Sequence, residues 1–237
     1  MSLAARKIRL IMKLRRSGIT NTAVLAAIER VPREAFVPAP FLDQAYEDRT
    51  LPIGHGQTLS QPQVVALMTQ ALEVKPSHRV LEVGTGSGYQ AAVLSLLARD
   101  VFTVERYAAL LEEALQRFAE LGLRNIHARV SDGNRGWPGE APFDRIMLTA
   151  AGPDVPPALL GQLATDGIMV LPVGPERGDQ DLIRLTRTAT GFREEMLAPV
   201  RFVPLLAGTV GPDEPDRNDP DDLELGDVAG PGESGLA

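Results

Sequence analysis

Short apolar runs and amphipathic segments alternate along the middle of the chain. Runs of strand length are separated by stretches whose apolar residues recur every three or four positions, which is the spacing typical of helices. The predicted strands are 79–83, 101–105, 126–130, 143–149 and 168–173, and the predicted helices are 89–99, 107–121 and 156–163. This alternation predicts an α/β fold with a doubly wound, mostly parallel sheet and helices on both of its faces.

The pattern changes on either side of this region. From residue 180 apolar and polar residues alternate with a period of two, which predicts antiparallel strands that close the sheet. Residues 1–50 contain two amphipathic helices and then several prolines, which indicates an added helical part. We therefore expect one domain over residues 1–206. The predicted closing strands are 181–188, 192–197 and 200–205, and the predicted N-terminal helices are 3–16 and a segment capped by Thr20 or Asn21 that ends near residue 30.

Residues 207–237 differ from the rest in composition. They hold nine of the 31 acidic residues and one of the 24 basic residues, are rich in glycine and proline, and lack aromatic residues. Such a segment cannot bury enough apolar surface to offset the entropy of ordering, so we predict a disordered acidic tail. Without it, the net charge of −7 becomes nearly neutral. No basic run follows the first helix, which disfavours a nucleic-acid partner.

The chain has no cysteine, so disulfides and thiolate chemistry are excluded, and its three histidines are scattered, so we expect no metal site. The first 17 residues contain six Lys or Arg and no uninterrupted apolar run. This pattern fits neither a signal peptide nor a membrane anchor. We expect a soluble, cytoplasmic protein that is a monomer and binds no membrane.

The clearest chemical signal is a glycine loop between a predicted strand and a predicted helix. Gly84, Gly86 and Gly88 let the backbone turn tightly and approach a ligand, and the helix that follows offers free N–H groups. The dinucleotide fingerprint G-x-G-x-x-G would need a glycine where Tyr89 stands. The pattern with Glu82 two residues before the first glycine instead resembles motif I of the Rossmann-like class I S-adenosylmethionine (SAM) methyltransferases.

A second carboxylate, Glu105, ends the next predicted strand, 19 residues after Gly86. A carboxylate at that place can accept both ribose hydroxyls of a nucleoside. Asp132 and Thr149 also follow predicted strands, and ligands in such sheets bind beyond the carboxyl ends of the strands, so these residues should meet in one crevice. The alternatives are a buried turn with a surface glutamate, and a simple turn at Asp132-Gly133.

Residues 51–62 form a glycine-containing loop that delivers Ser60 to the start of a predicted helix. Ser60 followed by Gln63 makes a capping box. Local evidence alone therefore favours a helix cap over a catalytic group at Ser60. It also favours a loop residue over a general base at His55.

Taken together, these motifs resemble the protein-L-isoaspartate (D-aspartate) O-methyltransferase family over residues 5 to 206. The most specific stretches are Gly-Gln-Thr-Leu-Ser-Gln-Pro (56–62) and Val-Arg-Phe-Val-Pro-Leu (200–205), because the glycine loop is shared with many methyltransferases. The chain departs from the family in its acidic tail and in Asp166-Gly167, where Gly-Gly is usual. The other matching stretches are 82–90, 103–106, 132–133, 141–144, 149–151 and 171–174.

The resemblance implies a repair enzyme that methylates the free carboxylate of L-isoaspartyl residues in damaged proteins and peptides, with SAM as the methyl donor. It also implies that Ser60 meets the substrate carboxylate, which reverses the local interpretation. Arg106 would lie beside the adenine of SAM, and Gln57, Thr58 and Leu59 would cover the cofactor. The full set of implied cofactor-binding residues is Gln57, Thr58, Leu59, Glu82, Gly84, Gly86, Gly88, Glu105, Arg106, Asp132 and Gly133.

Three alternatives stay open at this point. A methyltransferase of the same fold could act on a small molecule or an RNA. A binding module could hold SAM without turnover. A nicotinamide-dependent reductase is the third, and the missing glycine at residue 89 argues against it.

Overall fold

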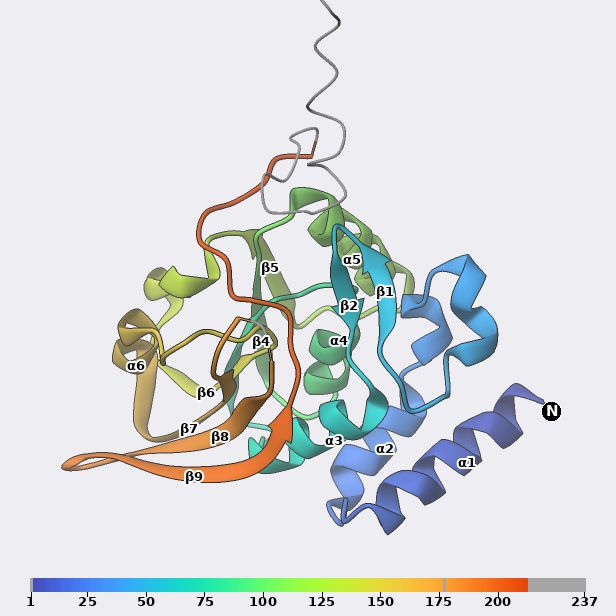
Figure 1. Ribbon diagram of the computed structural model, residues 1–237, viewed down its shortest axis with the longest axis horizontal. Coiled ribbons are helices and arrows are strands. Elements are labelled where there is room, and N and C mark those ends of the chain that lie inside the picture. The colour runs from blue at the N-terminus through green and yellow to red at the C-terminus, as the bar shows by residue number, and fades with distance from the viewer. Residues whose placement is uncertain (1, 177, 213–237) are drawn as a thin grey trace, which may run out of the picture.

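The computed structural model of the protein describes residues 2–176 and 178–212. At its centre lies a mixed sheet in the order β5-β4-β3-β6-β7-β8-β9 (Figure 1). The pairs from β5 to β7 are parallel, whereas β8 is antiparallel to β7 and β9. This topology confirms the predicted fold class. The strands are β3 (Arg79–Val83), β4 (Asp100–Glu105), β5 (Ile126–Val130), β6 (Phe143–Leu148), β7 (Leu163–Val173), β8 (Gln180–Thr188) and β9 (Gly191–Val200).

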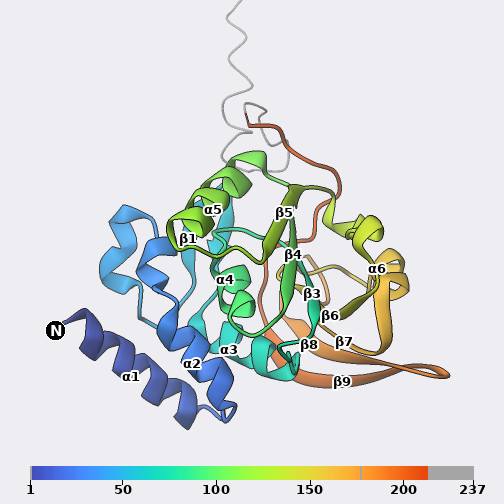
Figure 2. The ribbon, with the colours of Figure 1, turned by 180° about the vertical axis from the view of Figure 1, so that it is seen from behind.

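Helices cover both faces of this sheet, as the two opposite views show (Figures 1 and 2). Successive side chains of a strand point to opposite faces. Val80 and Val101 therefore belong to the larger core, to which the helices from α1 to α5 contribute. Leu81 and Phe102 belong to the smaller core, together with Leu159 of α6. The helices packed on the sheet are α3 (Pro62–Ala71), α4 (Tyr89–Ser95), α5 (Ala108–Glu120) and α6 (Pro157–Gln162), with 3₁₀ turns η3 (Gly133–Arg135) and η4 (Pro138–Glu140).

The chain reverses its winding direction at β3. Strands β4 and β5 follow on one side of β3, and β6 then pairs with its other side. The loops after β3 and β6 therefore diverge and leave a crevice at the carboxyl ends of these strands, where ligands bind in sheets of this kind. Gly84 follows β3 and Thr149 follows β6, so both lie at this point.

The N-terminal part packs on the larger core. It consists of α1 (Leu3–Arg16), α2 (Thr22–Arg30), η1 (Arg33–Phe36) and η2 (Ala39–Gln44). Asn21, one of the two predicted caps, accepts hydrogen bonds from the N–H groups of Ala23 and Val24 through its Oδ1 atom. The Oε1 atom of Gln70 on α3 accepts from the N–H groups of Thr20 (2.8 Å) and Asn21 (2.9 Å), which fixes the start of α2 against the main domain.

The segment predicted as a loop at residues 51–62 contains a hairpin. Its strands β1 (Leu51–Gly54) and β2 (Gln57–Leu59) are antiparallel and form a sheet of their own. His55 lies in the turn with φ of 51°, and this agrees with its assignment as a loop residue. The hairpin was not predicted because its strands are short and contain Pro52, which strands disfavour.

Two predictions near the C-terminal strands are wrong in detail. The Asp-Gly pair 166–167 has the composition of a turn that would precede a strand at 168, but it lies inside β7, where Asp166 has a φ of 59° and the register with β6 shifts, so the extra residues form a bulge. The predicted strand 200–205 is absent, because β9 ends at Val200 and the chain then crosses the carboxyl ends of the parallel strands. There it pairs with Ala151, whose N–H donates to the Val203 carbonyl at 2.8 Å.

The prediction that disorder begins at residue 207 is wrong for residues 207–212. Val210 is 7% exposed. Its N–H donates to the Arg106 carbonyl at 2.8 Å and its carbonyl accepts from the Ala108 N–H at 3.0 Å. A buried side chain, these backbone hydrogen bonds and a hydrogen bond from the Gly208 N–H to Asp132 hold this stretch, and the average composition of the whole tail concealed them. The remaining residues of the predicted tail, 213–237, lie outside the described residues.

Candidate active site

The glycine loop forms the floor of a cavity at the reversal point. Gly84 has a φ of 99°, and a Cβ atom there would lie 2.3 Å from Oγ1 of Thr149. The Thr149 hydroxyl donates to the Gly84 carbonyl at 2.7 Å, so the ends of β3 and β6 are held directly together. Gly88 has a φ of 91° and lies against Phe118 of α5, 2.7 Å from where its Cβ would be. A side chain at either position would collide with these neighbours and force the loop to shift.

Glu105 is a buried carboxylate at one end of this cavity. It is 6% exposed, and its Oε2 atom accepts from the Gly86 N–H at 2.8 Å. Its Oε1 atom accepts from the N–H groups of Arg106 (2.8 Å) and Tyr107 (3.1 Å). Burial raises the pKa of Glu105, and these backbone donors and Arg106 act in the opposite direction. Each oxygen has further lone pairs, so the carboxylate can also accept hydroxyl groups of a ligand.

Glu82, in contrast, does not line the cavity. It is fully buried, and its Oε2 atom accepts from the Thr103 hydroxyl at 2.6 Å. The Thr103 hydroxyl lies 2.6 Å from that of Thr85, which does line the cavity. Burial raises the pKa of Glu82 to about 8, and the Thr103 hydrogen bond only partly offsets this effect. Glu82 therefore supports the glycine loop from below, through two hydroxyls.

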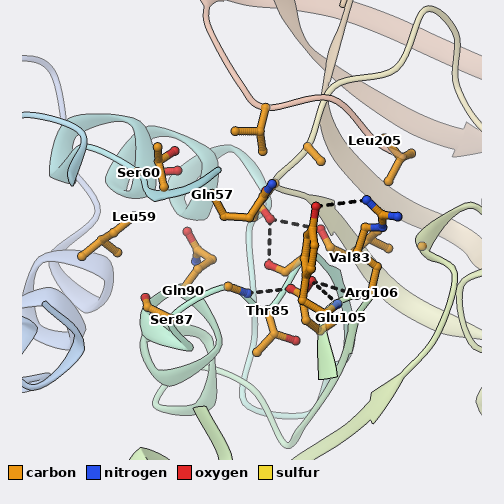
Figure 3. Close-up of a pocket in the computed structure, with 18 of the residues that line it drawn as sticks. Gln57, Leu59, Ser60, Val83, Thr85, Ser87, Gln90, Glu105, Arg106 and Leu205 are labelled. Atoms are coloured by element: carbon orange, nitrogen blue, oxygen red, sulfur yellow. Dashed lines mark hydrogen bonds between the residues drawn. The ribbon is translucent and has the colours of Figure 1, made fainter. Parts of the chain in front are cut away.

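The roof of the cavity comes from two segments that are far apart in the sequence. One segment is β2 together with the residue that follows it, Gln57 to Ser60, and the other is residues 203–206. Figure 3 shows Leu59 and Ser60 on the side of the N-terminal helices, with Glu105 and Arg106 at the opposite end. The cavity therefore joins the predicted active-site serine to the predicted ribose carboxylate.

Ser60 does not cap α3, so the capping-box prediction is wrong. The cap residue is Gln61, whose side chain makes no capping bond. The N–H of Gln63, which a serine cap would have bound, instead donates to Oδ1 of Asp48 at 2.8 Å. Among the described residues, Ser60 is hydrogen-bonded through its carbonyl, which accepts from Arg33. Its hydroxyl is left available to a ligand.

Ser60 also stands where the first cavity meets a second one. Both cavities are lined by Thr58, Ser60, Thr149 and Val203. The second cavity extends away from Glu105 toward Asp179 and residues 199–203. The arrangement places Ser60 at the wall of both cavities.

The structure therefore brings together nine of the predicted site residues and leaves three outside the cavity wall. Gln57, Thr58, Leu59, Ser60, Gly84, Gly86, Glu105, Arg106 and Gly133 line the cavity, whereas Glu82, Gly88 and Asp132 do not.

Asp132 has a structural role outside the cavity. Its Oδ1 atom accepts from the Asn134 N–H at the start of η3, and its Oδ2 atom accepts from the Gly208 N–H at 3.0 Å. Burial would raise the pKa of Asp132, but these hydrogen bonds outweigh burial and lower it. Asp132 thus holds the chain at Gly208, just after the roof segment 203–206, and its neighbour Gly133 lines the cavity.

Sequence reasoning missed several residues of the cavity wall. Tyr89 and Gln90, at the start of α4, line it, and so do the residues from Val203 to Leu206. The signal for the closing segment was present in the stretch Val-Arg-Phe-Val-Pro-Leu, which was interpreted as a strand. Tyr89 was noted only as the residue that breaks the dinucleotide fingerprint.

Two further findings concern the described residues as a whole. No cluster of three or more His, Cys, Asp or Glu side chains in residues 2–176 and 178–212 has a geometry that could hold a metal ion. No helix in the same ranges combines the length and the apolar character that crossing a bilayer requires.

Comparison with known proteins identifies the family. Residues 5–209 match the model of the protein-L-isoaspartate(D-aspartate) O-methyltransferase family. This chain belongs to that family. It is 61% identical over 216 residues to a protein-L-isoaspartate O-methyltransferase of Rhodospirillum centenum, covering 91% of this chain and 97% of the relative. It is 59% identical over 217 residues to one of Rhodospirillum rubrum, covering 91% and 99%.

Solved structures agree with this assignment. A protein-L-isoaspartate O-methyltransferase superposes with a TM-score of 0.77 at 26% identity, over 86% of this chain and 67% of the other. A Plasmodium falciparum protein of the same description, solved with S-adenosyl-L-homocysteine, superposes with a TM-score of 0.73 at 24% identity, over 84% of this chain and 97% of the other, and supports the fold.

Proposed function

We propose that the two joined cavities bind SAM and an isoaspartyl peptide, and that the protein methylates the free carboxylate of L-isoaspartyl residues in damaged proteins. The observation that carries this proposal is the position of Ser60 between a cavity with a buried Glu105 and a second, open cavity. The family supplies the reaction class. The product ester closes to a succinimide as the backbone nitrogen displaces methanol, and hydrolysis reopens the ring partly to normal aspartate and so repairs the chain.

The residues of the first cavity fit SAM. Glu105 has free lone pairs for the ribose hydroxyls, and the cradle at Gly84, which a Cβ atom would fill, suits the methionine part. Arg106 and Gly133 line the end that would hold the adenine, while Gln57, Thr58 and Leu59 cover the cofactor. Glu82, Gly88 and Asp132 contribute from behind this wall by holding the loops.

The methyl transfer requires few chemically active groups from the protein. SAM supplies an electrophilic methyl group on a sulfonium. A carboxylate with a pKa near ~4 is already ionised at neutral pH, so no general base is needed. Catalysis is then mostly alignment of the oxygen, methyl and sulfur atoms, which can lower a barrier by roughly 7–11 kcal/mol. The Ser60 hydroxyl orients the substrate carboxylate by donating a hydrogen bond to it.

The deciding experiment is transfer of a labelled methyl group from SAM to an isoaspartyl peptide and to its normal aspartyl twin. We expect label on the isoaspartyl peptide alone. Label on neither peptide, with SAM still bound, would favour a binding module. Label on an RNA or a small metabolite instead would favour another substrate on the same fold.

The cellular setting is part of this proposal. A cytoplasmic monomer fits a substrate set of aged cellular proteins and a chain without cysteine. Sedimentation of the purified protein tests whether it is a monomer. A larger species whose fraction rises with protein concentration would contradict the proposal.

A further inference from the structure

Arg33 is a buried cation beside the proposed substrate site. It begins η1 in the N-terminal part of the chain and is 0% exposed. Its Nε atom donates to the Ala45 carbonyl at 2.9 Å, and its Nη2 atom donates to the Ser60 carbonyl at 2.7 Å. Its guanidinium lies over the ring of Tyr89, 4.6 Å from the ring centre. Arg33 thus touches the residue that carries the proposed active hydroxyl and a residue of the cavity wall.

The environment of Arg33 balances its charge only in part: Asp48 and the Tyr89 side chain favour the charged form, and burial opposes it. No carboxylate forms an ion pair with it in the ranges that the structure describes, and its Nη1 atom has no hydrogen-bond partner there. The buried hydroxyl of Tyr89 makes no hydrogen bond of ordinary geometry in the same ranges, and the charged group nearest to act on it is Arg33 itself. Burial lowers the pKa of Arg33, but an arginine keeps its proton at any pH at which proteins are active. A buried charge that is not neutralised is costly, so this site favours the arrival of an anion.

We propose that Arg33 is a positioning residue for the methyl transfer: it fixes the Ser60 backbone through the Ser60 carbonyl, and its charge, which no ion pair neutralises, favours a substrate carboxylate at the Ser60 hydroxyl. Only the backbone of Ser60 separates the guanidinium from that hydroxyl. The inference rests on the proposed function. It also gives the N-terminal helices a role, since η1 presents a charge that the sheet does not supply.

Simple stabilisation is the competing explanation, and it predicts different behaviour. Replacement of a buried ion by an apolar residue of similar volume is often neutral or stabilising. A purely structural Arg33 would change the melting temperature and leave the recognition of negative charge untouched. A positioning Arg33 would change that recognition whatever happens to the melting temperature.

The test compares R33M and R33K with R145M in the full chain. Arg145 on β6 is a matched control because it is also buried, at 7% exposed, and donates to the Glu73 carbonyl, away from both cavities. Two peptides are used, an isoaspartyl peptide and its analogue with a neutral carboxamide in place of the free carboxylate. Their dissociation constants are measured by calorimetry with S-adenosylhomocysteine present, together with methyl-transfer kinetics and the dissociation constant of SAM.

We expect the wild type and R145M to bind the carboxylate peptide more tightly than the carboxamide. In R33M this preference should fall at least fivefold and the peptide KM should rise about tenfold, while SAM affinity stays within twofold. R33K should keep the preference, since it keeps the charge, but show a peptide KM at least threefold higher because an ammonium lacks the planar fork.

A folded R33M with the wild-type preference and KM overturns the proposal. If R33M does not fold, R33K decides alone, and an unchanged peptide KM overturns it. A wild type that methylates no isoaspartyl peptide contradicts the proposed function instead, and this result is separate from any difference between the variants.

Discussion

The first cavity, the proposed cofactor half of the site, and the second cavity, the proposed substrate half, are built in different ways. The cofactor half comes from consecutive residues at the ends of β3 and β4, and its carboxylate, Glu105, is held by three backbone N–H groups. The proposed substrate half is assembled from Ser60 after the hairpin, the N-terminal η1 and residues 199–203. One half is encoded by a local motif, and the other exists only once distant segments have packed together.

The two halves also differ in how completely their polar groups are satisfied. Glu105 has several donors, whereas the Ser60 hydroxyl and one nitrogen of Arg33 have no partner among the described residues. Unsatisfied polar groups next to a cavity are available to a ligand, and they are costly when the ligand is absent. We therefore expect substitutions in the cofactor half to alter SAM affinity, and substitutions in the substrate half to alter turnover at constant SAM affinity.

Ser60→Asp is the variant that tests this difference between the two halves most strongly. A second anion beside the substrate carboxylate repels it at close range. We expect kcat/KM for an isoaspartyl peptide to fall more than ~100-fold, equivalent to about 3 kcal/mol, with SAM affinity unchanged in calorimetry. Ser60→Ala is the control. It should retain part of the activity and keep the wild-type melting temperature, because the hydroxyl caps no helix. A fully active Ser60→Asp would remove the substrate carboxylate from this place.

Glu82→Gln tests whether the cofactor half depends on a buried acid beneath it. The folded-state pKa of about 8 lies above the ordinary value of 4.5. The folded protein therefore binds an extra proton between these values, and the stability due to Glu82 is fully present below about pH 4.5 and is lost as the pH rises through about 8. Relative to Glu82→Gln, the wild type should lose on the order of a few kcal/mol between pH 5 and 9.

Denaturant unfolding across that pH range measures the Glu82 effect. Glu112→Gln is a suitable control because Glu112 is exposed on α5, and its unfolding should follow the wild type at every pH. Parallel pH profiles for the wild type and Glu82→Gln would mean that Glu82 titrates normally in the folded protein.

Glu105→Ala addresses the cofactor half directly. The variant loses a carboxylate that the ribose hydroxyls would use, so SAM affinity should fall by about 1–3 kcal/mol, the scale of charged hydrogen bonds. Calorimetry with SAM measures this change, and Ser60→Ala in the same titration should bind as the wild type does. Unchanged affinity in Glu105→Ala would exclude Glu105 from the site.

The sequence was most informative where function depends on neighbouring residues. The alternating pattern predicted the parallel sheet because each strand is an apolar run, and the glycine spacing with Glu105 predicted the floor of the cavity. The family resemblance implied that Ser60 meets the substrate carboxylate, whereas the local pattern alone had assigned Ser60 to a helix cap. That assignment failed because Asp48 occupies the N–H of Gln63, and this contact forms only in the folded chain.

Other features could not be read from a linear pattern. Arg33 lies among prolines in a short turn, and nothing near it in the sequence indicates that its guanidinium reaches the Ser60 carbonyl. The stretch 200–205 has the alternation of a strand but crosses the sheet instead, because its hydrogen bonds go to Ala151 after β6. In both cases the deciding partner is distant in sequence.

The smallest expected effect concerns the C-terminal boundary of the domain. Removal of residues 213–237 should leave the melting temperature and turnover near the wild type, since that segment is acidic and poor in apolar residues.

Truncation after Ala207 also removes Val210, whose backbone is hydrogen-bonded to the backbone of Arg106 and Ala108 beside the proposed cofactor half. We expect a cost of about 1 kcal/mol, or ~2–4 °C in Tm, with a slightly weaker SAM complex. Val210→Ala in the full chain should reproduce part of this loss in calorimetric melting. Equal melting temperatures for the two truncations would show that the segment 207–212 adds nothing to the cofactor half, whereas a large loss on removal of 213–237 would move the boundary of the domain beyond Pro212.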